Sequence, residues 1–109
     1  MISVSEFRRL DLRVARIGSA APIPGTDRLL GVEVDLGNEH RALVAGVARR
    51  YTPNQLIGTQ VVVAANVEPV TTIRGVTSIG VLLGANCHAT EEIALLTANR
   101  EVANGTRVE

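Results

Sequence analysis

The alternation of apolar and polar side chains predicts that the chain begins with a meander of three β-strands. Residues 10–17 (LDLRVARI) alternate with a period of two, which places one face of a strand against a core and the other toward solvent. Gly18 interrupts the alternation, and a glycine in a long first strand allows the bend or bulge that a barrel corner requires. A second alternation over residues 32–36 and a third strand over 41–47 flank Gly37-Asn38, a pair that favours a hairpin turn.

A continuous apolar run in the middle of the chain has a different pattern. Residues 61–65 (VVVAA) predict a strand that is buried on both faces. Pro69 lacks an N–H, so it should mark the point where the chain leaves this strand. A second apolar run, residues 79–85, predicts the strand that returns. Residues 73–78 between the two runs hold one cation, one glycine and two hydroxyls, and two core strands would present this segment at the surface as a candidate binding site.

Capping residues predict two short helices. Ser3 and Glu6 have capping-box spacing, so residues 4–9 are expected to form one helical turn before the first strand. Residues 52–58 (TPNQLIG) place Thr, Pro, Gln and Gly at the N-cap, first, third and stop positions of a short connecting helix. A last short strand is expected over residues 93–96, followed by a tail.

Three meander strands, a short helix and two further strands follow the order of an OB-fold. We therefore expect an all-β, five-stranded OB-fold barrel with a short connecting helix, formed as one domain by residues 1–109. Ligands of such barrels usually lie across strands two and three and the loops joining strands one to two and four to five. The sequence places residues 24–28 in the first loop and 69–78 in the second, and they contain Arg28 and Arg74 respectively.

Composition narrows the partners that the chain can attract. Hydrophobic residues make up 46% of the chain but aromatic residues only 2%, so the core must be aliphatic. The 11 basic residues, all of them arginine, balance 11 acidic residues, and the formal net charge is zero. Long-range attraction to nucleic acid or to an anionic membrane is therefore not a property of the whole chain, and a basic site requires local segregation of charge.

The single cysteine and the N-terminal sequence indicate a compartment. Cys87 cannot form an internal disulfide, which fits a reducing environment. The N-terminal residues contain no apolar segment typical of a signal peptide, and no run is long enough to span a membrane. We expect a cytoplasmic protein without a membrane partner, and Met1 favours a complete unit.

An enzymatic function is not favoured by the residues. His40 and His88 are the only histidines, and neither a Ser/His/Asp order nor metal-ligand spacing can be assembled from them. Cys87 and His88 are adjacent, so on a strand they would face opposite ways. We expect no catalytic residues, no metal and no cofactor.

Several polar positions admit two interpretations. The doublets Arg8-Arg9 and Arg49-Arg50 most often face water in such sequences, and contact with a polyanion is the alternative. Asn66 can cap a turn through its side chain or contact a ligand. Gly75 and Gly80 are best explained by backbone conformation or close packing.

Seven segments together resemble the tRNA-binding domain family. This family includes the C-terminal appendix of bacterial methionyl-tRNA synthetases, stand-alone structure-specific tRNA-binding proteins, and domains of the endothelial monocyte-activating polypeptide II type. The resemblance runs in order through nearly the whole chain. Its segments are LDLRVARI at 10–17, PIPGTDRLL at 22–30, VDLGNEHRALVAGVA at 34–48, YTPNQLIG at 51–58, VVVAANVEP at 61–69, IRGVTSIG at 73–80 and NGTRV at 104–108.

The resemblance implies an OB-fold with a C-terminal extension, homodimerisation, and non-catalytic binding of tRNA by shape rather than by sequence. Arg28 takes the place of the family's lysine after aspartate in the first loop, and Arg41 matches a basic residue that opens the third strand. The family signature N-L-x-P…R-G-x-x-S-x-G-M falls on Asn66, Arg74, Ser78 and Gly80. The implied roles are phosphate pairing by the arginines and hydrogen bonding to sugar or phosphate oxygens by Asn66 and Ser78.

Departures from the family pattern bear on the strength of binding. Val70-Thr71-Thr72 stands where the family usually has Arg-Lys, Ile79 replaces a usual glutamate, and Val81 replaces a usual methionine. Each lost phosphate contact should flatten the dependence of log affinity on log salt by about 0.7–0.9. The scarcity of aromatics removes stacking platforms worth about 1–3 kcal/mol per base.

Two functions of different classes follow from these observations. The first is non-catalytic tRNA binding, by a stand-alone protein or in trans with an aminoacyl-tRNA synthetase of the methionyl type. The second is a protein-binding or chaperone-like module of the same fold, which the neutral charge and the apolar residues Val70, Ile73, Ile79 and Val81 near the site would suit. An enzyme acting on a small molecule is the least favoured reading.

Overall fold

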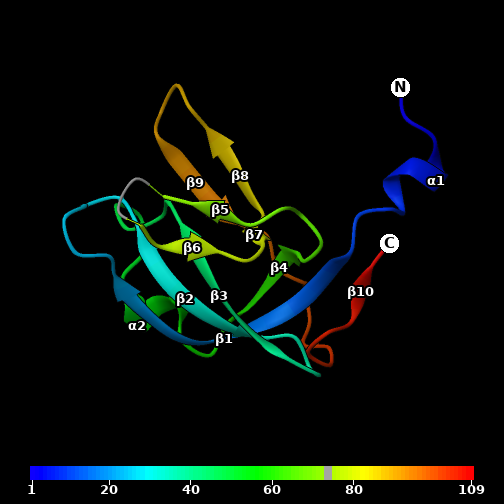
Figure 1. The fold of residues 1–109 in the computed structure, drawn as a ribbon, viewed down its shortest axis with the longest axis horizontal. Helices are drawn as coiled ribbons and strands as arrows, with labels where there is room; N and C mark the ends of the chain where they lie inside the picture. Colours follow the sequence, from blue (N-terminus) through cyan, green and yellow to red (C-terminus); the bar gives the residue numbers. More distant parts are fainter. Residues whose placement is uncertain (73–74) are drawn as a thin grey trace.

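Five antiparallel strands form a nearly closed barrel in the computed structural model, which describes residues 1–72 and 75–109 (Figure 1). Their order in the sheet is β3-β2-β1-β4-β7, with β1 at the centre. The predicted all-β, OB-like barrel is confirmed. The strands are β1 (Leu12–Pro22), β2 (Leu30–Asp35), β3 (His40–Ala45), β4 (Gln60–Ala64) and β7 (Val81–Leu82).

The remaining elements decorate this barrel. Two short helices, α1 (Val4–Phe7) and α2 (Pro53–Leu56), precede β1 and connect β3 to β4. Two hairpins, β5 (Val70–Thr71) with β6 (Thr77–Ser78) and β8 (Gly84–Cys87) with β9 (Glu92–Leu95), lie outside the five-stranded order. The C-terminal strand β10 (Arg107–Val108) pairs with the start of β1, where Leu12 faces Val108.

The barrel closes where β3 meets the segment between β6 and β7. The backbone N–H of Ile79 donates to the carbonyl of Ala42 at 3.1 Å. The Ser78 hydroxyl accepts a hydrogen bond from the Val44 N–H and donates one to the Gly80 carbonyl, each at 2.9 Å. A side chain therefore supplies hydrogen bonds that a longer strand would have supplied through its backbone.

Gly80 is required at this seam for two reasons. Its φ of 127° lies in a region that residues with a side chain rarely adopt. A Cβ at this position would also lie 3.0 Å from the Leu43 side chain and 3.2 Å from the Ala64 carbonyl oxygen. The sequence analysis attributed Gly80 to backbone conformation or close packing, and the close approach of β3 and β4 to this residue agrees with that role.

The core is aliphatic, as the composition predicts. Its largest fully buried side chains are Ile17, Leu30, Val34, Leu36, Leu43, Val47 and Val63, which come from the barrel strands and the turns that follow them. Residues 61–65 are all buried, so the prediction of a strand covered on both faces is confirmed. Burial of such side chains, each worth about 1.5–3 kcal/mol, is the main stabilising contribution in a domain without disulfides.

Local signals in the first half of the chain are confirmed. The register between β1 and β2 shifts between Ile17 and Ser19, so Gly18 marks the predicted bulge. Both capped helices form, with Ser3 and Thr52 as N-caps. Gly58 has a φ of 89° and ends the second helix.

The second half of the chain departs from prediction at two points. Residues 79–85 are not one returning strand: β7 covers only Val81–Leu82, and the chain then turns outward at Gly84 into the β8–β9 hairpin. A Cβ at Gly84 would lie 3.2 Å from the Ala94 carbonyl, so the absence of a side chain permits this tight pairing. The residues of β10 were expected to form an irregular tail and instead form a short strand.

The first strand also begins later than predicted. It was expected from Leu10, but β1 begins at Leu12 and leaves Leu10 exposed.

The two chain ends leave the same side of the barrel. Figure 1 shows α1 and β10 together at one end of the longest axis, while the β1–β2 loop lies at the other end. The molecule measures 40 Å along this axis. No helix in the described ranges is long and apolar enough to cross a membrane.

Ser78→Ala should destabilise the fold through the seam. Removing the hydroxyl leaves the Val44 N–H without its hydrogen-bond acceptor, which should lower the free energy of unfolding by about 1–3 kcal/mol. Urea unfolding followed by circular dichroism measures the change. Ser19→Ala, at an exposed serine of β1, is the matched control and should stay within about 0.5 kcal/mol of the parent. Equal stabilities of the two variants would contradict this role of Ser78.

Candidate nucleic-acid interface

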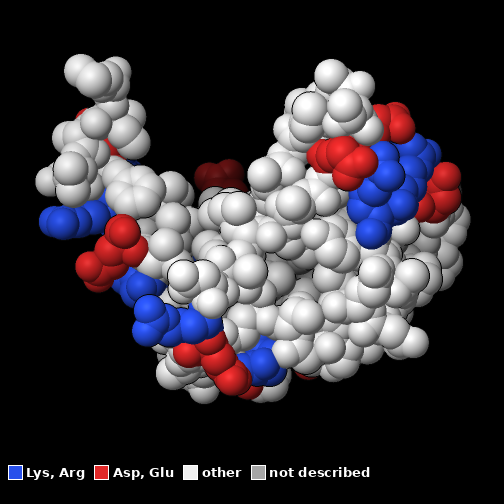
Figure 2. Space-filling view, turned by 180° about the vertical axis from the view of Figure 1, so that it is seen from behind, with Lys and Arg blue, Asp and Glu red and all other residues white. Residues whose placement is uncertain are grey.

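On the face that Figure 2 shows, arginine and acidic side chains lie mixed in two areas on either side of a largely uncharged surface. Several arginines form ion pairs with acidic side chains: Arg13 with Asp11, Arg16 with Glu101, Arg41 with Glu39, Arg49 with Asp27, and Arg50 with Glu92. Local segregation of charge thus exists, but each area contains both signs.

The guanidinium of Arg41 is already bound by groups of the protein itself. One terminal nitrogen of its guanidinium donates to the Glu39 carboxylate at 2.6 Å, and the other donates to the Ala65 carbonyl. The side chain is half-buried. It connects the start of β3 to the end of β4, so phosphate pairing by Arg41 would compete with two existing partners.

Asn66 fastens the N-terminal segment to the barrel. Its side-chain oxygen accepts a hydrogen bond from the Asp11 N–H at 2.7 Å, and its amide donates to the Arg9 carbonyl at 2.6 Å. The sequence left two interpretations of Asn66 open, capping through its side chain or contact with a ligand. In the structure, the oxygen and the nitrogen of its amide both have backbone partners. Ligand contact by Asn66 remains a prediction.

Ser78 and Gly80 belong to the barrel wall. Ser78 is 8% exposed, and its hydroxyl already accepts one hydrogen bond and donates another within the protein. Gly80 is buried against Leu43 and Ala64. Arg74, the remaining residue of the family signature, lies outside the described residues.

Arg28 has a free cationic group as far as the described part of the chain shows. In the described ranges, its guanidinium has no hydrogen-bond or ion-pair partner, and its backbone N–H donates to the Thr26 hydroxyl at 3.1 Å. It lines a pocket of about 450 Å³ between the β1–β2 loop, the turn after β3 and the β8–β9 hairpin. The polar residues around this pocket are Arg28, Arg49, Arg50, Asn86, His88 and Glu91.

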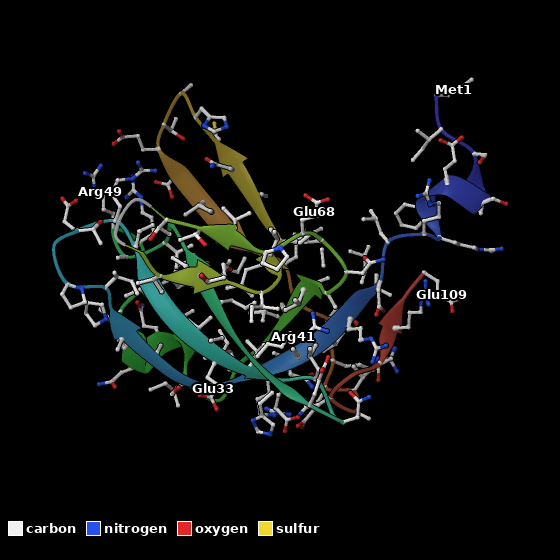
Figure 3. All side chains as sticks on the ribbon, viewed as in Figure 1. Met1, Glu33, Arg41, Arg49, Glu68 and Glu109 are labelled. Carbon is white, nitrogen blue, oxygen red and sulfur yellow. The ribbon has the colours of Figure 1, made fainter. Side chains whose placement is uncertain are left out.

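The predicted residues therefore do not form one cluster. Arg28 shares its pocket with Arg49, whereas Arg41 lies well apart from Arg49 in Figure 3. The doublet Arg49-Arg50 was interpreted mainly as a solvated pair, and the structure places both residues beside Arg28. The signal for this was the position of the doublet directly after the third strand, at the same end as the first loop.

An apolar groove lies beside this pocket. Its volume is about 320 Å³, and it runs between β3, the β5–β6 hairpin and the β7–β9 segment. Val70 and Val81 line it and are 59% and 42% exposed. Ile93 borders both the groove and the basic pocket.

Catalytic and metal-binding groups are not assembled in residues 1–72 and 75–109. No three His, Cys, Asp or Glu residues in these ranges are placed to hold a metal ion. Cys87 is exposed, and a hydrogen bond from Thr90 lowers the pKa of its thiol. A lone thiol without a neighbouring base does not constitute a nucleophilic site.

A second exposed apolar surface is formed by the N-terminal segment. Helix α1 buries none of its side chains, and Figure 1 shows that it projects from the barrel. Ile2, Val4, Phe7 and Leu10 are between 37% and 65% exposed. Contiguous apolar surface of this kind marks interaction sites in soluble proteins.

The barrel, the arginine-lined pocket and the adjoining groove together have the form of a small binding module. The family described as "Putative tRNA binding domain" matches residues 12–107. The chain belongs to this tRNA-binding domain family.

Relatives of this chain include much longer proteins. It is 47% identical over 107 residues to a methionine–tRNA ligase of Thermococcus kodakarensis, and 45% identical over 108 residues to that of Methanosphaerula palustris. These matches cover 98% and 99% of this chain but only 14% and 16% of the ligases. The chain thus corresponds to a small part of each ligase.

Solved structures of similar size share the fold. A protein related to methionyl-tRNA synthetase from Pyrococcus horikoshii matches with a TM-score of 0.92 and 31% identity, covering 100% of this chain and 98% of the other. The chaperone CsaA from Bacillus anthracis matches with a TM-score of 0.92 and 30% identity, covering 100% and 99%.

Asp11 should give stability a specific dependence on pH. The hydrogen bond from Arg13 lowers the pKa of the Asp11 carboxyl, aided by the charges of Arg13, Arg107 and Arg41. A carboxyl whose pKa is lower in the folded state stabilises the fold above its unfolded pKa of about 3.9, and this stabilisation is lost as the pH falls toward the folded value. The advantage of the parent over Asp11→Asn should therefore be constant above about pH 5 and shrink below about pH 4.

Urea unfolding of both proteins between pH 2.5 and 7 measures this difference. Because only the difference is compared, the titration of the other carboxyls cancels. The effect should be modest, since the pair is partly exposed and screened by solvent. Parallel stability curves through the whole range would contradict it.

Proposed function

We propose that this protein is a non-catalytic tRNA-binding module of the cytoplasm, which recognises tRNA by shape and backbone, alone or in trans with a methionyl-type synthetase. Membership of the tRNA-binding domain family over residues 12–107 is the observation that carries the proposal. The identity of 47% to part of a methionine–tRNA ligase supports the synthetase-related role.

The aromatic residues favour recognition of backbone over bases. The hydroxyl of Tyr51 accepts a hydrogen bond from the Leu95 N–H at 3.1 Å, and its half-buried ring packs against the core. Phe7 lies on α1, away from the barrel mouth (Figure 1). Neither ring is placed to stack on a base beside Arg28, so binding at this end of the barrel depends on phosphate and sugar contacts.

Titration of tRNA at two salt concentrations tests this function. Binding should be measurable at 50 mM salt and should weaken on raising the salt, with a log–log slope of about 0.7–0.9 for each phosphate contact. A single-stranded RNA of equal length should bind more weakly, because shape recognition requires the folded molecule. Absence of binding at low salt would refute the proposal, and equal affinity for both RNAs would refute recognition of shape. Arg74, which the family signature includes, is tested in the same assay, where Arg74→Ala should weaken binding.

We also propose a homodimer formed through the N-terminal surface. Its support is the exposed apolar set on and around α1, which a second copy would cover. Two joined barrels would give tRNA a second attachment point, which raises the apparent affinity without new contacts per barrel.

Phe7→Glu should convert the dimer to a monomer, because it places a charge in the apolar surface. Sedimentation velocity measures the mass, and tRNA affinity should fall together with dimerisation. Ile57→Glu, at an apolar residue that is 46% exposed outside this surface, is the control and should leave the mass unchanged. A parent protein that sediments as a monomer at micromolar concentration would rule out the dimer.

The apolar groove supports a second candidate function, a protein-binding or chaperone-like module. Val70 and Val81 expose apolar surface beside it, and the CsaA chaperone of Bacillus anthracis has the same fold at 30% identity. Binding of extended apolar peptides without measurable tRNA binding would favour this function, and the reverse result would eliminate it.

A further inference from the structure

We propose that the pocket between the β1–β2 loop and the β8–β9 hairpin is a phosphate-binding site in which Arg28 and Arg49 supply the charge and the hairpin supplies additional donors. The inference rests on the proposed function in assigning this phosphate to the backbone of tRNA. The proposed site includes Arg49 and the β8–β9 hairpin, and neither of these belongs to the family signature.

Three arginines reach this pocket from two distant parts of the chain. Arg28 lies in the β1–β2 loop, and Arg49 and Arg50 follow β3. Their availability differs. Arg28 has no side-chain partner in the described part of the chain, and its guanidinium lies near the backbone of Gly46, whose added Cβ would stand 4.0 Å from it. An unpaired guanidinium retains its full set of donors for an incoming anion.

Arg49 is held only weakly. One terminal nitrogen contacts the two carboxylate oxygens of Asp27 at 3.2 and 3.3 Å, and the two side chains are 56% and 80% exposed. Exposed pairs of this kind contribute little and exchange readily. A phosphate that carries a full negative charge and several acceptor oxygens can therefore take this guanidinium from Asp27.

Arg50 has a positioning role. Its Nε donates to the Glu91 carbonyl at 2.9 Å, and a terminal nitrogen donates to the Thr90 carbonyl at 3.3 Å. These bonds tie the turn of the β8–β9 hairpin to the segment after β3. The hairpin is thereby fixed over Arg28 rather than left to move independently.

The fixed hairpin directs two polar side chains to the pocket. Asn86 of β8 and His88 of the turn that follows it both line the pocket. An amide and an imidazole N–H are suitable donors to phosphate oxygens. The described residues around this pocket include no Phe, Tyr or Trp, and the imidazole of His88 can donate to a phosphate oxygen, so the pocket suits a phosphate better than a stacked base.

One lining residue opposes the proposed ligand. Glu91 lies at the pocket, and its backbone has a φ of 57° while its carbonyl accepts from Arg50. Its position is thus set by the hairpin turn, and its carboxylate repels an anion. Removing this charge should strengthen phosphate binding, which a purely structural pocket would not do.

The first experiment uses inorganic phosphate as the probe. Amide resonances of the full chain are followed by NMR during titration with phosphate, with chloride at equal ionic strength as the reference. Shifts concentrated at Arg28, Gly46, Asn86 and His88 are expected. Shifts that are absent, or equal to those in chloride, would overturn the site.

The second experiment compares tRNA affinity among variants. Arg28→Ala and Arg49→Ala should each weaken binding about tenfold, because a lost charged hydrogen bond is worth about this factor. Each should also flatten the salt slope by about 0.7–0.9. Arg100→Ala removes an equal charge from an exposed residue that does not line this pocket, and should change affinity less than about twofold.

Glutamate variants complete the test. Glu91→Gln should strengthen tRNA binding about threefold, while Glu68→Gln, at an exposed residue far from Arg49 in Figure 3, should have no comparable effect. If the parent binds tRNA but the pocket and control variants behave alike, the site is overturned and the proposed function stands. If tRNA does not bind while phosphate shifts the pocket residues, the proposed function fails and the phosphate site stands.

Discussion

Closure of the barrel between β3 and the segment at residues 78–80 is the constraint on which the remaining structure depends. Strand β7 contributes only two residues, so the ring of backbone pairing is short at this point. Ser78 completes it through hydrogen bonds of its side chain, and Gly80 permits the approach of Leu43. Ser78 and Gly80 also line the apolar groove, so the same closure of the barrel positions one wall of that groove.

Arginine has two distinct uses in this protein. Arg16, Arg41, Arg50 and Arg107 donate to backbone carbonyls that are far away in the sequence, and so they join loops and chain ends to the barrel. A planar guanidinium with several donors suits this use better than a lysine would. Arg28 has no such partner in the described ranges, so an electrically neutral chain still has a cation that is not used to hold the fold together.

The pattern of side chains was sufficient for most of the fold but not for the site. Alternation located β1 to β3, and capping residues located both helices, because these signals are local. The prediction of a single strand over residues 79–85 was wrong, because periodicity cannot distinguish one strand from two that meet at Gly84. For the site, sequence could not reveal that Ser78 accepts from Val44 or that Asn66 binds the backbone of Arg9 and Asp11, since these partners lie 34 to 57 residues away. The contribution of Arg50 was missed for the same reason: the carbonyls it binds belong to a hairpin 40 residues further on.

The position of the two chain ends has a consequence for assemblies that contain this barrel. Any polypeptide joined to either end would leave the molecule at the α1 and β10 end of its longest axis, opposite the β1–β2 loop that carries Arg28 (Figure 1). The whole molecule, α1 included, measures 40 Å along this axis, which is comparable with about seven turns of an α-helix. A domain attached at either end would therefore be separated from the arginine-lined pocket by the length of the barrel.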